Sequence, residues 1–188
     1  MSAEQLSHAV PVPNVTYRRA SAESTEYPAG SFDLAVSAQA VHWFDHAHYY
    51  EEVRRVVRPG GLIAAAGYGR CLLEEELDPI LDRFYREVLG PYWDPERAHI
   101  ESHFQDIPFP FREITAPPFE ASLQWTTAQL FGYLRTWSAV ARSKAETGVD
   151  PVEEFERTLL HALERAHRSG SPIGLRIPYF LRVGVCER

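Results

Sequence analysis

Residue types capable of chemistry gather between Gln39 and His48, where three histidines fall close together. His46 and His48 are two residues apart, and on a helix this spacing places them on different faces. A metal site would need ligands that share a face, or a supporting carboxylate in a fixed shell, so this pattern does not predict one. His42 is left as the candidate for a catalytic base, with a packing role as its alternative.

Aromatic side chains are the second group of candidates. Trp43 directly follows His42, and its indole either anchors a loop under a sheet or forms the wall of a pocket. Tyr133 and Trp137 are four residues apart and share one face of a predicted helix, which either packs into the core or lines a substrate pocket. The sequence contains no GxSxG, P-loop, HExxH or GxGxxG motif. A catalytic triad and a phosphate loop are therefore not predicted.

A strand, a helix and a second strand are expected to position the segment from Gln39 to Trp43. Residues 32–38, FDLAVSA, and 62–69, LIAAAGYG, have the apolar character of strands buried on both faces of a parallel sheet. One connecting helix predicts a right-handed crossover between parallel strands. Ligands bind off the carboxyl ends of such strands, so the segment that follows Ala38 lies where a ligand is expected.

The connecting helix is expected to begin after Asp45, because aspartate commonly caps helix N-termini. Its apolar residues recur with helical spacing on one face, at Tyr49, Val53, Val56 and Val57. The charged residues are expected on the opposite, solvated face: Glu51, Glu52, Arg54 and Arg55. The sequence Pro59-Gly60-Gly61 is expected to end the helix.

The rest of the chain is expected to mix helices with extended segments, which indicates an α/β protein. Further helices are predicted at residues 2–9, 74–89 and 126–141, and from Pro151 onward. Extended segments are predicted at residues 14–17, 112–125 and 175–188.

Length, charge and cysteine content narrow the class of protein. A chain of 188 residues suits one domain, and a net charge of -7 without a basic stripe argues against a nucleic-acid partner. Cys71 and Cys186 form no CxxC pair, which predicts neither a disulfide framework nor a zinc site and suits a reducing, cytoplasmic compartment. No apolar run approaches the roughly 20 residues that span a bilayer, so no membrane partner is expected.

Three stretches, NVTYRRASAE, SFDLAVSAQAVHWFD and YYEEVRRVVRPGGLIAAAGYG, together resemble the class I S-adenosylmethionine-dependent methyltransferases of the methyltransferase-11 type. The segments LGPYWDPER, IPFPF, APPF and QLFGYLRTWSAV are similar to the substrate-side part of the group that includes trans-aconitate methyltransferase-like proteins. The resemblance implies a single domain over residues 1–188. It also implies a partial Rossmann-like methyltransferase sheet, mostly parallel, with helical cap insertions.

The resemblance also implies which residues bind the cofactor, S-adenosyl-L-methionine. Ser21, Ala22 and Glu23 match the family segment that contacts the adenine. Ala38 and Gln39 match the positions beside the methionine part of the cofactor.

For the acceptor side, His42 and Trp43 match the loop between cofactor and acceptor, and Tyr133 and Trp137 match the helix that covers the acceptor. Methyl transfer from a sulfonium is an in-line displacement with an activated leaving group, so the protein mainly supplies position and a dry, polar environment. A carboxylate acceptor needs no general base. A hydroxyl or amine acceptor would use His42.

The chain departs from the family pattern at its start. In the family a strand with a glycine loop, a helix and a strand ending in an acidic residue come first, whereas MSAEQL matches the helix beyond them. The resemblance therefore implies an N-terminally incomplete domain, with self-association or a partner chain covering the missing central strand. The expected function is methyl transfer to a small-molecule acceptor. The alternative is a catalytically incompetent remnant that acts as a binding or assembly partner.

Overall fold

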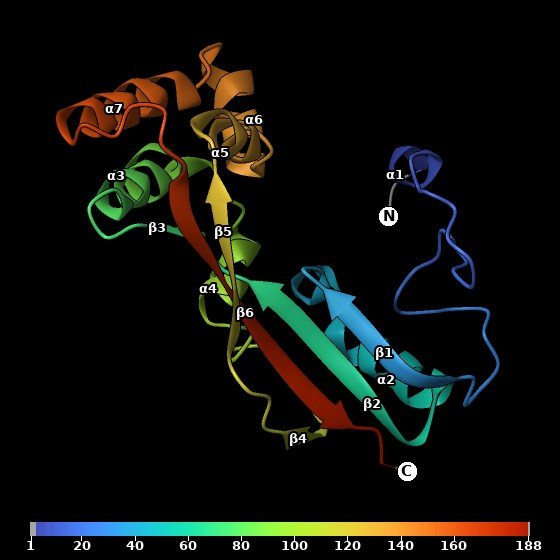
Figure 1. Ribbon diagram of the computed structural model, residues 1–188. Coiled ribbons are helices and arrows are strands. Elements are labelled where there is room, and N and C mark those ends of the chain that lie inside the picture. Colours follow the sequence, from blue (N-terminus) through green and yellow to red (C-terminus); the bar gives the residue numbers. More distant parts are fainter. Residues whose placement is uncertain (1–2, 188) are drawn as a thin grey trace. The chain divides into compact units, whose positions relative to one another are not determined.

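The computed structural model describes residues 3–187 (Figure 1). The chain divides into two compact units, which we describe one at a time. The first unit contains the residues up to Ala66, residues 107–116 and the residues from Leu181 onward. The second unit contains residues 67–106 and 117–180.

The first unit is built around a parallel strand–helix–strand arrangement. Its elements are α1 (Ala3–Ser7), β1 (Phe32–Ala38), the 3-10 turn η1 (Val41–Trp43), α2 (His46–Val56), β2 (Val57–Tyr68, as far as Ala66) and β4 (Arg112–Ile114), with the last part of β6 (Ile173–Val185). β1 and β2 run parallel, with Leu34 opposite Leu62 and Ala38 opposite Ala66. The predicted βαβ unit is confirmed.

Helix α2 forms as its sequence pattern predicts. The Asp45 carboxylate accepts a hydrogen bond from the backbone N–H of His48 at 3.2 Å, so Asp45 is the N-cap. Tyr49, Val53 and Val56 are buried along one face. β2 begins directly after the helix at Val57, so Pro59-Gly60-Gly61 lies within the strand.

Two predictions for the first unit are wrong. β1 is not buried on both faces, because Leu34 and Val36 are 48% and 58% exposed. The reason is that β1 lies at the end of the strand order and only one of its faces is covered in the described structure. Residues 14–17 form no strand; Asn14 has a φ of 65°, and Val15 and Tyr17 are exposed, because no other described strand pairs with this segment.

The second unit packs helices against a short antiparallel sheet. Its strands are β3 (Leu72–Leu73), β5 (Phe119–Trp125) and the first part of β6. Its helical elements are α3 (Asp78–Arg83), the π-helix η2 (Phe84–Val88), η3 (Gly90–Tyr92), η4 (Pro95–Arg97), α4 (Ala98–Glu101), α5 (Thr127–Leu134), α6 (Ser138–Thr147) and α7 (Val152–Arg165). Leu81, Leu130, Leu134 and Leu159 lie in its core and are fully buried.

The α/β class is confirmed, but a mostly parallel sheet is not. β3, β4 and β5 each pair antiparallel with β6, so the sheet is mixed. A parallel pair needs a long crossover connection, and among the pairs with described register only β1 and β2 are joined in this way, through α2.

The helices predicted at residues 74–89 and 126–141 are each divided in the structure. The helix expected at residues 74–89 begins at Asp78 and changes to a π-helix at Phe84. The helix expected at residues 126–141 has the predicted cap, since Thr126 and Gln129 form a capping box. It ends at Leu134, however, and α6 starts at Ser138. No helix within residues 3–187 is long and apolar enough to cross a membrane.

Candidate functional site

The carboxyl end of β1 carries an unusual backbone conformation at Gln39. Its φ is 50°, in the left-handed region that residues other than glycine rarely adopt. Its N–H donates to the carbonyl of Ala66 at 2.9 Å, so the strand pairing continues one residue past Ala38 before the chain turns away. Such conformations cost about 1–3 kcal/mol and cluster at functional sites. Gln39 thus turns the chain sharply at the edge where ligands are expected.

The turn η1 that follows exposes one aromatic ring and buries the other. Trp43 is 55% exposed, whereas His42 is 7% exposed and its ring centroid lies 5.0 Å from that of Trp43. His46 holds the turn through Nε2, which lies 3.1 Å from the carbonyl of Val41. This burial agrees with the packing alternative for His42. Its role as a general base stays a prediction.

Ser21 and Glu23 lie beside the end of the same turn. The Ser21 hydroxyl donates to the Glu23 carboxylate, and the other carboxylate oxygen accepts from the backbone N–H of Asp45 at 3.2 Å. The Ser21 hydrogen bond lowers the pKa of Glu23, so this carboxyl is ionised at neutral pH. Ala22, between them, is half-buried. The segment predicted to contact the adenine is therefore fixed to the N-cap of α2 at Asp45.

Glu52 is a positioning residue, and its predicted place on the solvated face of α2 is wrong. It is buried, accepts a hydrogen bond from the Thr25 backbone N–H at 2.7 Å and pairs with Arg55 at 2.7 Å. Arg55 also donates to the carbonyl of Tyr27 at 2.7 Å. Hydrogen bonds from Arg55 and Thr25 lower the pKa of Glu52 to about 2. The pair holds residues 25–27 against α2. No local sequence pattern predicts that this loop covers the helix.

Tyr133 and Trp137 lie in the second unit, within a group of aromatic rings that we call the aromatic cluster. Its members are Tyr85, Trp93, Trp125, Tyr133 and Trp137. The rings of Tyr133 and Trp137 meet edge to face with centroids 5.8 Å apart, and both side chains are half-buried against the core. Burial raises the pKa of Tyr133 to about 12, so its hydroxyl stays protonated.

Arg97 joins the aromatic cluster and was not singled out from the sequence. Its guanidinium carbon lies 4.1 Å from the centroid of the Trp93 ring, and its Nε donates to the Tyr85 hydroxyl at 2.7 Å. A cavity of about 370 Å³ is lined by Tyr85, Trp93 and Arg97 among others. A guanidinium held on aromatic rings is well suited to bind a carboxylate in a bidentate manner.

The predicted site residues thus form two groups. Ser21–Glu23 and Ala38–Trp43 belong to the first unit, and Tyr133 and Trp137 belong to the second. Within residues 3–187 no group of three or more histidine, cysteine, aspartate or glutamate side chains is arranged to hold a metal ion.

A parallel βαβ unit, with a left-handed turn at the carboxyl end of its first strand, places the chain among the α/β proteins that bind ligands at such strand ends. Comparison with known proteins narrows this class. Residues 1–65 match the model of a methyltransferase domain family. A structure from Anaeromyxobacter dehalogenans, named as a type II methyltransferase, is 40% identical, with a TM-score of 0.89 over 99% of this chain and 78% of that chain.

Curated relatives agree with this match. A Dictyostelium discoideum protein named as a methyltransferase is 30% identical over 180 residues, which are 94% of this chain and 68% of that protein. An uncharacterized methyltransferase of Mycobacterium tuberculosis is 28% identical, and the match covers 89% of this chain and 62% of that protein. The chain belongs to the class I S-adenosylmethionine-dependent methyltransferase family.

Proposed function

We propose that the protein transfers a methyl group from S-adenosylmethionine to a small-molecule acceptor. The observation that carries this proposal is the left-handed turn at Gln39, at the carboxyl end of β1 and followed by the exposed Trp43. Membership of the methyltransferase family supports the reaction, and the position of the turn supports the site.

The residues of the first unit fit the chemistry of this cofactor. Its adenine, ribose and ammonium groups carry hydrogen-bond donors, and Glu23 offers an ionised acceptor. Ser21 and Asp45 occupy only part of that acceptor capacity, since a carboxylate has about four lone-pair sites. Ser21, Ala22 and Glu23 would hold the adenine end, and Ala38 and Gln39 the methionine end.

When bound, the cofactor would supply a methyl group attached to a sulfonium. The sulfur leaves as a neutral thioether, so its departure needs no acid catalyst. The residues of this chain would then act by position and by exclusion of water. Trp43 would cover the reacting centre. His42, which is buried behind Trp43, would hold the indole in place.

For the acceptor we propose a small carboxylic acid, as in the trans-aconitate methyltransferase-like group. A carboxylate oxygen is already a nucleophile, which suits a turn whose histidine is buried. In the second unit Arg97 supports the same class of ligand, because it presents a cation on the rings of Trp93 and Tyr85. Tyr133 and Trp137, which belong to the same aromatic cluster, would contact the acceptor, as the resemblance implies.

Calorimetric titration with S-adenosylmethionine and S-adenosylhomocysteine tests the cofactor site. We expect saturable binding by the wild-type protein, and weaker binding, by about tenfold, by Gln39→Ala. Glu51→Ala, an exposed position on α2, is the matched control and should bind like the wild type. A folded protein that binds neither compound at high micromolar concentration would lack the proposed activity. An unchanged affinity of Gln39→Ala would place the site elsewhere.

The variant Trp43→Ala distinguishes a role in acceptor binding from a role in cofactor binding. With a panel of small carboxylic acids and a measurement of S-adenosylhomocysteine formation, we expect the variant to lose acceptor turnover by about tenfold or more. Its cofactor affinity should change much less. The reverse pattern, weaker cofactor binding with normal acceptor turnover, would show that Trp43 contacts the cofactor and not the acceptor.

The alternative function, a binding or assembly partner without catalysis, is favoured by one observation. Leu34 and Val36 expose apolar surface on the end strand β1, and exposed apolar patches mark interaction sites.

A further inference from the structure

The guanidinium of Arg97 is fixed on one side and keeps two donor groups for a further partner. It lies over the ring of Trp93, and its Nε donates to the Tyr85 hydroxyl at 2.7 Å. Its two Nη atoms form no hydrogen bond and no ion pair with any residue from 3 to 187. A half-buried cation is therefore held in place by contacts that do not neutralise its charge.

The acidic residues that line the same cavity have other partners. Asp94 pairs with Arg142, and Glu101 accepts a hydrogen bond from the Tyr85 hydroxyl at 3.2 Å. Neither carboxylate forms an ion pair with Arg97 in the described part of the chain. The positive charge of Arg97 is thus left for a ligand.

Two other arginines of the second unit show what a half-buried guanidinium binds there. Arg70 and Arg168 are half-buried like Arg97. The two Nη atoms of Arg70 each lie 2.8 Å from a carboxylate oxygen of Asp78, and Arg168 binds both carboxylate oxygens of Glu74 in the same bidentate manner. Arg97 differs in that the described chain supplies no carboxylate to it. A carboxylate is therefore the ligand that its planar fork fits.

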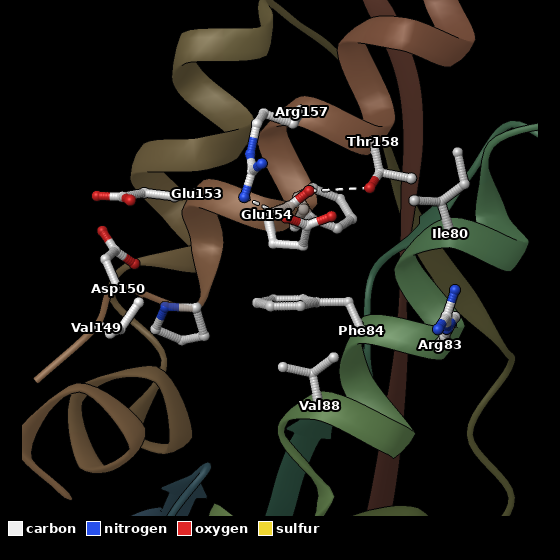
Figure 2. A pocket seen from close by; sticks show the side chains of 12 residues that line it. Ile80, Arg83, Phe84, Val88, Val149, Asp150, Glu153, Glu154, Arg157 and Thr158 are labelled. Atoms are coloured by element: carbon white, nitrogen blue, oxygen red, sulfur yellow. Dashed lines mark hydrogen bonds and ion pairs between the residues drawn. The ribbon is translucent and has the colours of Figure 1, made fainter. Parts of the chain in front are cut away.

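A second cavity of this unit, of about 260 Å³, lacks such an arginine. It lies at Phe84, between α3–η2 and the start of α7 (Figure 2). The two arginines that line it are already paired: Arg83 with Glu87 at 3.1 Å, and Arg157 with Glu154, the pair drawn in Figure 2. A carboxylate ligand is therefore not expected in this cavity.

We propose that Arg97 holds a carboxylate of the acceptor that is not itself methylated, so that the acceptor is a small dicarboxylic acid. This inference rests on the proposed function. A carboxylate bound through both oxygens has its charge balanced by the guanidinium, which lowers its nucleophilicity. The acceptor then needs a second carboxylate as the nucleophile. One oxygen of that group bonds to the methyl carbon while the carbon–sulfur bond breaks and its electron pair stays on sulfur, which gives S-adenosylhomocysteine and a monomethyl ester.

The first test is binding to the whole chain without cofactor. Succinate, glutarate and adipate are titrated, and binding is followed by calorimetry and by the chemical shift of the Trp93 indole N–H. Glutaramide is the neutral ligand of matched length. We expect saturable binding of at least one dicarboxylate and none of glutaramide. Arg97→Gln should weaken that binding by about tenfold, because hydrogen bonds between charged groups are lost.

Arg86→Gln is the matched control, because Arg86 lines the same cavity but pairs with Asp82 at 3.0 Å. It should bind the dicarboxylate like the wild type, and circular dichroism checks the folding of each variant. Arg97→Lys keeps the charge but not the planar fork, so its affinity should lie between those of the wild type and Arg97→Gln. If Arg97→Gln does not fold, Arg97→Lys is the deciding variant.

Four binding results would overturn the proposal. They are no saturable binding of any of the dicarboxylates, equal binding of glutaramide, a wild-type affinity in Arg97→Gln or Arg97→Lys, and an equal loss of affinity in Arg86→Gln.

Turnover is the second test, with the dicarboxylate that binds best and the monocarboxylate of the same chain length. We expect mass spectrometry to show the monomethyl ester as the product, and the monocarboxylate to have the higher KM. Arg97→Gln should raise the KM for the dicarboxylate by about tenfold with little change in kcat. Equal KM values for the two acids in the wild type would overturn the role of Arg97. Binding that depends on Arg97 without any methylation would contradict the proposed function and leave the carboxylate site in place.

Discussion

At the scale of single residues, the buried Glu52 links the stability of the first unit to pH. The pKa of this carboxyl is 4.5 when unperturbed and about 2 in the folded chain, so the unfolded chain binds more protons between these values. The stabilisation is complete above pH 4.5 and is lost as the pH falls toward 2.

For Glu52→Gln we expect a loss of about 1–3 kcal/mol in the free energy of unfolding at neutral pH, because the hydrogen bonds from Thr25 and Arg55 lose their charged acceptor. Urea unfolding at a series of pH values is the measurement. The variant should show a flatter decrease below pH 4.5 than the wild type. Glu51→Gln, exposed on the same helix, should keep the wild-type slope. Equal slopes for both variants would contradict the role of Glu52.

The residue scale also shows what local patterns miss. Gln39 and Trp43 were singled out because they follow a strand, and that position was confirmed. Arg97 and Glu52 were not, because each acquires its role from a segment elsewhere in the chain. Arg97 lies on Trp93 and Tyr85, and Glu52 lies under a loop that precedes its helix by about twenty residues.

At the scale of elements, α2 was predicted closely because its cap and its apolar stripe are local. The break between α5 and α6 was not predicted, because contacts with residues distant in the chain stabilise it. Arg135 binds Asp150 at 2.8 Å and Glu156 at 2.6 Å, and Trp137 joins the aromatic cluster. These contacts hold residues 135–137 outside a continuous helix, against their local preference.

The absence of a side chain at Gly61 allows the backbone of β2 to pack closely on β1, and the substitution Gly61→Ala tests this packing. A Cβ atom at this position would lie 2.6 Å from Val57 Cγ1 and 2.7 Å from the carbonyl oxygen of Asp33. We expect Gly61→Ala to destabilise the protein by about 1–3 kcal/mol, the usual cost of overpacking. Gly132→Ala has open space on α5 and should be neutral or stabilise by up to about 1 kcal/mol. Thermal unfolding of both variants is the check, and a neutral Gly61→Ala would contradict the packing described.

At the scale of the whole molecule, the exposed face of β1 bears on assembly. Leu34 and Val36 point to the same side of a strand that ends the strand order. One edge of β1 also has no partner strand in the part of the chain that the structure describes, and we propose that a second copy of the chain pairs there, because an open strand edge is a template for strand pairing.

Sedimentation velocity at tens of micromolar protein examines the pairing with a second copy. We expect self-association of the wild type and a shift toward monomer for Val36→Lys. Leu160→Lys, which places the same charge at a 41% exposed apolar position on α7, should leave the wild-type distribution. A wild type that stays monomeric, or a Val36→Lys variant that associates like the wild type, would contradict the proposal.

The sequence by itself determined the βαβ unit, the cap of α2 and the position of the turn after β1, because apolar runs, helical spacing and capping act over a few residues. The resemblance of its motifs to the methyltransferase family was confirmed by the comparisons. Only the tertiary structure decided the mixed sheet, the burial of Glu52, the aromatic cluster around Arg97 and the cavity at Phe84. Each depends on segments that are distant in the chain, and the free energy of their contacts outweighs local preference.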